Sequence, residues 1–287
     1  MPHAPHTHPT PSGSSPPASA PDGVLACGCT TNVVDDLLAQ AGLPRDRQRA
    51  QLWADIEAHV APHLGPLEGV LHDAEPGQTW GDLLVHRPTD ERPTIDIVSA
   101  GVSARRMRRT RALRKRGVPA RAEFILRFPE DWAATSTVSE TILSRDGAWI
   151  VLWMQVLARA PFMLNTFFGD EPGLEVQERL FPMELHRKAP FDAVLAANPA
   201  RFGPAFPSLN TIDGPRPTST SRAPARHSRS RSRSRRPGDD VVRFLSLIPL
   251  YREEFEFALR NGHQRLFERL ETAGVTDVVR VGRARVV

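Results

Sequence analysis

The chain has 287 residues with a formal net charge of +4, and 40% of its residues are hydrophobic, enough for a substantial core. The positive charge is concentrated. Residues 222–236 hold seven arginines and no acid, so the rest of the chain carries 4 − 7 = −3, which argues against a dedicated nucleic-acid-binding domain. Two cysteines, Cys27 and Cys29, are too few for a disulfide framework and fit a reducing compartment.

Residues 1–29 are rich in Pro, Ser and His and predict a disordered tail without the pattern of a secretory signal. The longest apolar stretch, residues 148–168, approaches the ~20 residues that span a bilayer. Gln155, Arg159 and Pro161 interrupt it, so the pattern favours a buried helix. We therefore expect a cytoplasmic protein that makes no membrane contact.

Apolar residues recur at three- and four-residue steps in two segments, 33–41 and 51–60, and each segment is predicted to be a helix. The next elements predicted in chain order are strands at 69–72, 81–87, 94–99 and 122–128, a helix at 149–160, a strand at 241–250, and helices at 251–261 and 264–273. This order predicts an α+β fold in which helices pack a mixed β-sheet.

Two segments interrupt the predicted elements. Residues 103–117 contain eight cationic residues and no acid, and residues 170–240 show only short apolar pieces around Phe181, 191–195 and 202–206. Within the second segment, residues 213–239 predict a disordered Arg/Ser-rich insertion. We expect a single domain over residues 30–287 that carries this insertion.

Motifs for metal binding are weak. Cys27 and Cys29 have no second cysteine pair, and the alternative for them is free thiols beside a disordered tail. His59 and His63 have the spacing of two metal ligands on a helix, but Pro62 lies between them and no Glu follows His59. The exposed end of a helix explains them better. We expect no metal ion and no cofactor.

Catalytic motifs are also missing from the sequence. Glu253 and Glu254 are adjacent in a predicted helix, where side chains point ~100° apart, so the two carboxylates cannot flank one bond. Acidic residues in a first turn instead oppose the helix dipole favourably. The chain has no phosphate-binding loop, dinucleotide fingerprint or nucleophile elbow. We therefore expect a protein that is not an enzyme.

Five segments of the chain, at residues 55–66, 82–103, 122–132, 153–172 and 241–279, carry a resemblance to a known family. The most specific parts are the Leu-Ala-Arg, Asn-Thr-Phe and Gly-Asp motifs within 157–170, and Ile-Pro-Leu-Tyr-Arg-Glu-Glu-Phe at 248–255. In this order they resemble the suppressor-of-fused family, specifically its stand-alone bacterial domain. The basic run at 103–117 and the Arg/Ser insertion depart from the family pattern as embellishments of loops.

The resemblance implies an interaction domain with no known catalysis. Animal members bind zinc-finger transcription factors by clamping an extended peptide between two domains, and this chain resembles only the N-terminal one. Bacterial members are inferred to be immunity proteins that neutralise toxins. In the animal domain a Tyr, a Phe and an Asp contribute to the peptide site. Phe167 and Asp170 match the last two, whereas Ala160 falls at the place of the tyrosine.

Two hypotheses about function follow. In the first, the chain binds a toxin or a regulatory protein through Phe167, Gly169 and Asp170, joined by basic residues of the run. These basic candidates are Arg105, Arg106, Arg108 and Arg109. The alternative is a nucleic-acid-associated regulatory protein that uses residues 103–117 and 222–236. Phe167 has an alternative role as an anchor in the hydrophobic core. The basic run has the alternative of being a solvated loop without a binding role.

Overall fold

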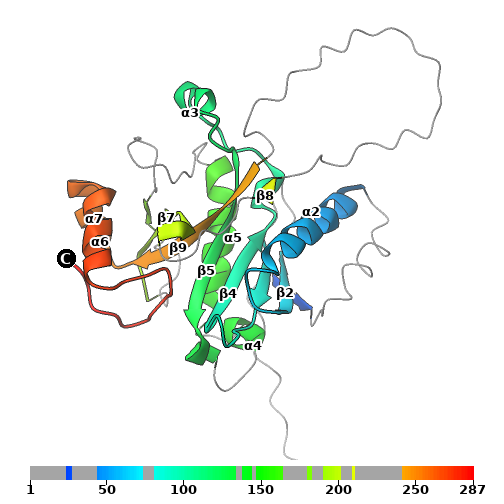
Figure 1. The fold of residues 1–287 in the computed structure, drawn as a ribbon, viewed down its shortest axis with the longest axis horizontal. Coiled ribbons are helices and arrows are strands. Elements are labelled where there is room, and N and C mark those ends of the chain that lie inside the picture. The colour runs from blue at the N-terminus through cyan, green and yellow to red at the C-terminus, as the bar shows by residue number, and fades with distance from the viewer. Residues whose placement is uncertain are drawn as a thin grey trace, which may run out of the picture.

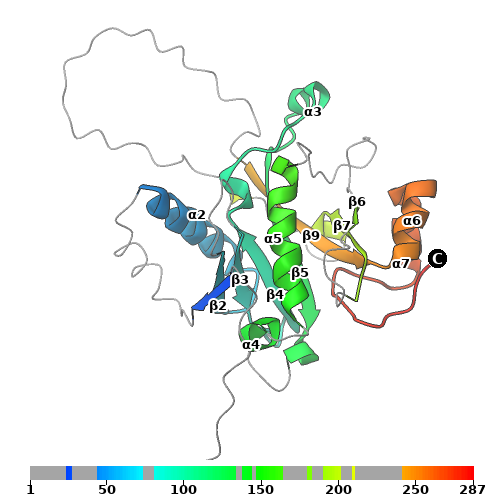
Figure 2. The same cartoon turned by 180° about the vertical axis from the view of Figure 1, so that it is seen from behind.

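The computed structural model describes residues 24–27, 44–73, 81–133, 138–143, 147–163, 180–182, 190–201, 209–210 and 241–287. In these ranges a mixed β-sheet forms the centre of the molecule, with helices on its faces and at one end (Figure 1, Figure 2). The predicted α+β class is confirmed.

The sheet contains nine strands: β1 (Val24–Cys27), β2 (Leu67–Asp73), β3 (Asp82–His86), β4 (Thr94–Ala100), β5 (Arg121–Pro129), β6 (Leu180–Pro182), β7 (Ala193–Ala197), β8 (Leu209–Asn210) and β9 (Val241–Leu250). Their order is β1-β2-β3-β4-β5-β9-β7-β6, and β8 pairs with β9. Only the β5–β9 pair is parallel among the described pairs. The chain therefore enters β5 and β9 at the same end of the sheet, where Arg121 lies opposite Val242.

The described helices are α2 (Pro44–Val60), α3 (Arg111–Lys115), α4 (Val138–Leu143), α5 (Ala148–Met163), α6 (Arg252–Asn261) and α7 (His263–Thr272). The described residues also form three short 3-10 helices: η1 (Val102–Ala104), η2 (Glu130–Ala133) and η3 (Pro199–Arg201). The apolar stretch that begins at residue 148 forms α5, and most of its side chains are buried, as predicted. In the part of the chain that the structure describes, no helix has both the length and the apolarity to cross a membrane.

Alternation along the strands gives the sheet two apolar faces. On β5, Phe124 belongs to the core that surrounds Trp153 of α5. Its neighbour Ile125 belongs to the core on the other face, which α2 covers with Trp53 and Ile56. A third core packs α6 and α7 against the ends of β7 and β9. These three cores hold the strands in place, and with them the points at which the connecting loops leave the sheet.

Most predicted elements are confirmed, and their bounds shift by a few residues. The prediction of irregular structure over 170–240 is wrong at β6, β7, η3 and β8. The five residues of β7 are all buried, and this strand lies between β6 and β9. Residues 24–27, placed in the tail by sequence, form β1 and pair with β2. The predicted helix at 33–41, the remainder of the tail and the insertion at 213–239 lie outside the described residues.

Candidate partner-binding site

The turn that follows β4 is held by a buried carboxylate of β5. Ser99 Oγ donates to Glu123 Oε2 at 2.6 Å, and the backbone amides of Gly101 and Ser103 donate to Glu123 Oε1 at 3.1 and 2.8 Å. Burial raises the pKa of Glu123, although the hydrogen bonds from the turn act in the opposite direction. Gly101 has a φ of 146°, a conformation that favours glycine. This turn fixes the point at which the basic run leaves the sheet.

The basic run forms a structured projection, residues 105–118, which we call the arginine knob. Its short helix α3 lies beyond the end of the sheet at which β5 and β9 begin (Figure 1, Figure 2). Met107, Leu113 and Val118 are buried beneath it. Thr110 caps α3 by accepting a hydrogen bond from the Leu113 amide at 3.3 Å. A simple solvated loop would not place three apolar side chains in the core.

The four arginines predicted to bind a partner all lie in the first half of the knob. Arg105, Arg106 and Arg108 are exposed, and Arg109 is half-buried and donates to the Val118 carbonyl. The guanidinium of Arg105 lies over the ring of Phe162 in α5, 4.8 Å from the ring centroid. The other predicted site residues lie outside the described residues: Phe167, Gly169 and Asp170. The structure therefore joins the knob to the end of α5, the helix that precedes those three residues in the chain.

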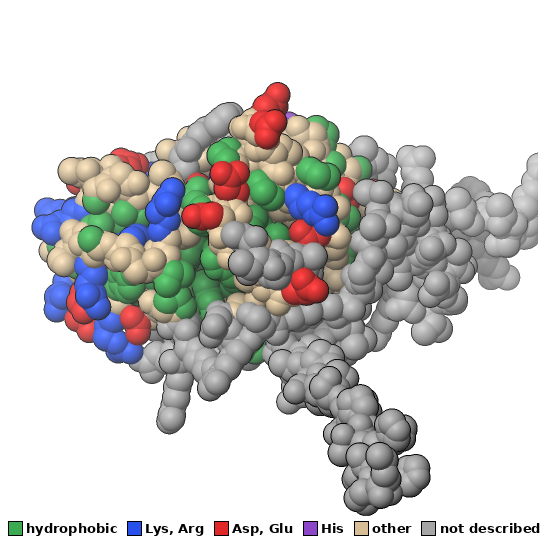
Figure 3. All heavy atoms as spheres, turned by 90° about the horizontal axis from the view of Figure 1, so that it is seen from below, with side chains coloured by type: hydrophobic (Ala, Val, Ile, Leu, Met, Phe, Trp, Pro, Cys, Tyr) green, Lys and Arg blue, Asp and Glu red, His purple; other side chains and the backbone are tan. Residues whose placement is uncertain are grey.

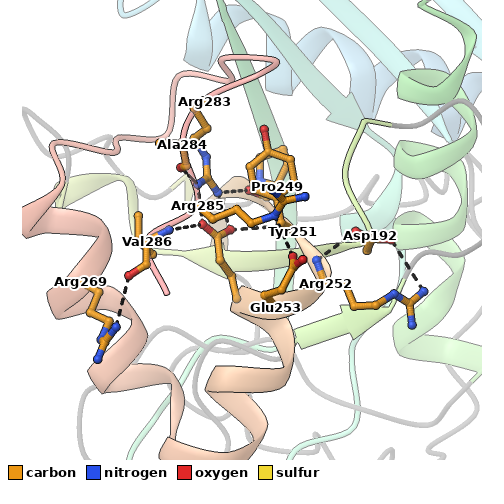
Figure 4. A network of polar contacts seen from close by, with 11 residues as sticks. Asp192, Pro249, Tyr251, Arg252, Glu253, Arg269, Arg283, Ala284, Arg285 and Val286 are labelled. Atoms are coloured by element: carbon orange, nitrogen blue, oxygen red, sulfur yellow. Dashed lines mark hydrogen bonds and ion pairs between the residues drawn. The ribbon is translucent and has the colours of Figure 1, made fainter.

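The Tyr-Arg-Glu-Glu motif follows the last residue of β9, where it begins α6 and holds the final segment of the chain, residues 273–287 (Figure 4). Glu254 is fully buried and forms a two-point ion pair with Arg283, with both N–O distances at 2.6 Å. The same carboxylate accepts hydrogen bonds from the amides of Tyr251 and Val286 at 3.0 and 3.1 Å. Glu254 thus caps α6 and anchors the final segment at once.

The neighbouring acid forms a separate and more exposed pair. Glu253 binds Arg285 at 2.9 Å, and both side chains are more than half exposed. The guanidinium groups of Arg283 and Arg285 lie 4.9 and 5.1 Å from the centroid of the Tyr251 ring. The two glutamates lie in the first turn of α6, as the sequence indicates, and each has its own arginine partner.

Comparison with known proteins decides the family. The family model of the Suppressor of fused protein (SUFU) matches residues 79–284, a range that runs from before β3 to the Arg283 anchor and includes the arginine knob. The chain belongs to the suppressor of fused family. The resemblance found in the sequence is confirmed.

Two solved structures resemble this SUFU domain at low sequence identity. A SUFU homologue from Neisseria gonorrhoeae FA 1090 shares 13% identity with a TM-score of 0.43, covering 83% of this chain and 97% of that one. The crystal structure of the Sufu-Fu complex shares 13% identity with a TM-score of 0.42, and the match covers 83% of this chain and 92% of that one. No curated protein matches this chain.

A buried charge network braces the centre of the SUFU sheet. Arg127 of β5 binds Asp96 of β4 at 2.7 Å and Asp277 of the final segment at 2.5 Å. Ser246 of β9 also donates to Asp277, at 2.6 Å. The amide of Val279 donates to the Arg127 carbonyl at 2.7 Å. The carboxylates are occupied by partners within the protein, so this cluster links strands that are distant in sequence.

The paired histidines of the SUFU domain lie at the end of α2. Their ring centroids are 6.0 Å apart, and the His59 ring stacks on Phe244 at 5.5 Å with an interplanar angle of 14°. His63 is exposed, as expected for a helix end. Across the described ranges, no group of three or more His, Cys, Asp and Glu side chains is arranged to hold a metal ion. Cys29 lies outside those ranges.

Sequence reasoning missed the residues that hold these sites in place. Glu123 had a readable signal, because it is the one acid in a largely apolar strand that comes after the Ser-Ala-Gly-Val-Ser turn. Arg283 had no such signal, since nothing in the sequence around it indicates that it pairs with Glu254. The exposed cations on α3 were part of the basic run, but their placement on a helix was not predicted.

Proposed function

We propose that this SUFU domain is a non-catalytic binding protein of the bacterial immunity type, which binds a toxin in the cytoplasm and blocks it. Membership of the suppressor of fused family supports a role in protein binding. The observation that carries the proposal is the arginine knob, a projection with a buried apolar base and an exposed cationic surface. Such a surface is preformed, so binding requires little ordering of the backbone.

The proposed mechanism is steric occlusion. The knob docks on the partner, and the segment after α5 that contains Phe167, Gly169 and Asp170 completes the contact surface. The position of Arg105 over Phe162 supports this arrangement, because it links the knob to the end of α5. Cationic side chains on a projection also steer an acidic partner during diffusional encounter. No chemical step is needed to inactivate the toxin.

Growth rescue tests this function. Each toxin candidate encoded beside the gene is expressed in a bacterial host, alone and together with the SUFU domain. The proposal predicts that one toxin arrests growth and that co-expression restores it. Failure of rescue with every adjacent toxin candidate would reject the immunity role.

A second candidate, a nucleic-acid-associated regulatory protein, is favoured by one observation. The two basic runs precede β5 and β9, and these strands are parallel neighbours that begin at the same end of the sheet. This role predicts salt-dependent binding to random DNA that deletion of residues 222–236 abolishes. Unchanged binding after the deletion, or no binding at low salt, would reject it.

A further inference from the structure

We infer that the arginine knob recognises an acidic protein surface, a compact patch of Asp and Glu side chains on the partner. This inference rests on the proposed binding function and names the chemistry of the partner. Three features of the molecule support it: the rigidity of the knob, the kind of cations that it presents, and the charge of the described residues outside it.

The knob is pinned at its base and in its second half. The amide of Met107 donates to the Ala120 carbonyl at 2.8 Å, which joins the segment leaving the sheet to the segment returning to it. The Val118 amide donates to the Leu113 carbonyl at 3.1 Å, and Gly117 has the positive φ of 70° that closes the helix. Arg121 donates to the Ser103 carbonyl below this point. The cations are therefore displayed on a fixed backbone.

Seven cationic side chains of the knob are exposed: Arg105, Arg106, Arg108, Arg111, Arg114, Lys115 and Arg116. Residues 103–117 contain no acid that could neutralise them within the run. Six of the seven are arginines, whose planar guanidinium groups bind carboxylates by two parallel hydrogen bonds. A dense patch of carboxylates matches this display.

A second basic area of the described surface differs from the knob. Figure 3 shows Lys and Arg side chains gathered at its left end, where α6, α7 and the final segment lie, with Asp and Glu side chains among them. Arg260 pairs with Glu256 at 3.7 Å, and Arg285 pairs with Glu253 at 2.9 Å. That end carries mixed charge and provides a natural control.

Charge outside the knob also favours a compact partner over a nucleic acid. The described residues outside the knob hold 17 Lys and Arg against 20 Asp and Glu, a net of 17 − 20 = −3. A nucleic acid is charged along its whole length and would meet this weakly negative surface beyond the knob. A local acidic patch touches the knob alone. The knob also exposes no aromatic ring on which bases could stack.

Binding of defined probes to the full chain tests the inference. The probes are a fluorescent peptide of alternating Asp and Glu and a fluorescent DNA duplex with the same number of negative charges, each measured by anisotropy at low and physiological ionic strength. The substitution R111Q/R114Q/K115Q removes three exposed charges from α3. We expect it to weaken peptide binding about tenfold, roughly twofold for each charge. The matched control R260Q/R265Q/R280Q should change it less than about twofold.

Three results would overturn the inference: no peptide binding by the wild-type chain, equal losses in the two triple variants, or tighter binding of the duplex than of the peptide. The last result would instead support the nucleic-acid role. Circular dichroism and thermal unfolding verify that both variants fold. Because the probes replace the toxin, failure here leaves growth rescue as a separate test of the immunity role.

Discussion

Gly65 shows how the absence of one side chain permits a close backbone contact. A Cβ atom at this position would lie 1.6 Å from the carbonyl oxygen of Arg87. The Gly65 carbonyl also accepts a hydrogen bond from Nδ1 of the buried His86, at 2.9 Å, so that nitrogen carries the proton.

The substitution G65A should lower the free energy of unfolding by about 2–4 kcal/mol, because the backbone must shift to relieve the clash. Urea denaturation measures this loss. Ala61→Ser changes an exposed residue of the same turn and should cost less than about 0.5 kcal/mol. A G65A protein as stable as wild type would show that the contact is not tight.

Glu123 makes stability depend on pH. Burial raises its pKa in the folded state above that of the unfolded state, so the unfolded chain releases the proton first as pH rises. The free energy of unfolding should therefore fall as pH rises from the unfolded-state pKa toward the folded-state pKa. Glu123→Gln keeps the shape without the charge and should remove this slope.

Urea unfolding of wild type and E123Q across about pH 4 to 8 tests the prediction. Glu130→Gln, a change at an exposed acid, serves as the control. An identical slope in wild type and E123Q would contradict the assignment to Glu123.

At the scale of elements, strands with long apolar or alternating runs could be predicted from sequence. β9 was predicted with its full bounds, because Val241–Leu250 is apolar nearly throughout and lies in the buried centre of the sheet. β7 was missed, since its short Ala-Val-Leu-Ala-Ala run holds one β-branched residue, Val194, and no aromatic residue to indicate a strand. Its burial comes from pairing with β9, which local sequence does not reveal.

The contacts between side chains of different elements could not be predicted from the sequence either. Arg127 and Asp277 are 150 residues apart, and only the completed sheet brings them together. In the candidate site, the basic run was visible as a charge pattern. Its anchors Met107 and Leu113 are too sparse among arginines to form a helical pattern, so α3 was not predicted.

Of the two ion pairs that the final segment makes with α6, we expect only the Arg283–Glu254 pair to contribute strongly to stability. Arg283 balances the fully buried Glu254, whereas Arg285 and Glu253 are both more than half exposed. R283M should lower the free energy of unfolding by about 3–5 kcal/mol, because it leaves a buried carboxylate without its partner. R285M should lower it by less than about 1 kcal/mol. Urea denaturation of the two variants makes the comparison, and equal losses would contradict it.

At the scale of the whole molecule, the two ends of β9 have different roles. The end at which β9 leaves the sheet connects to α6 and to the Glu254–Arg283 anchor, which is built from internal contacts. The end at which β5 and β9 begin carries the arginine knob, whose cations face solvent. A stable frame at one end thus supports a display surface at the other.

The most direct test is the dissociation constant for the partner protein that growth rescue identifies, measured with wild type, R111Q/R114Q/K115Q and R260Q/R265Q/R280Q. We expect the knob variant to bind about tenfold more weakly and the control to bind within about twofold of wild type. Wild-type affinity in the knob variant would contradict the claim that this domain engages its partner through the knob.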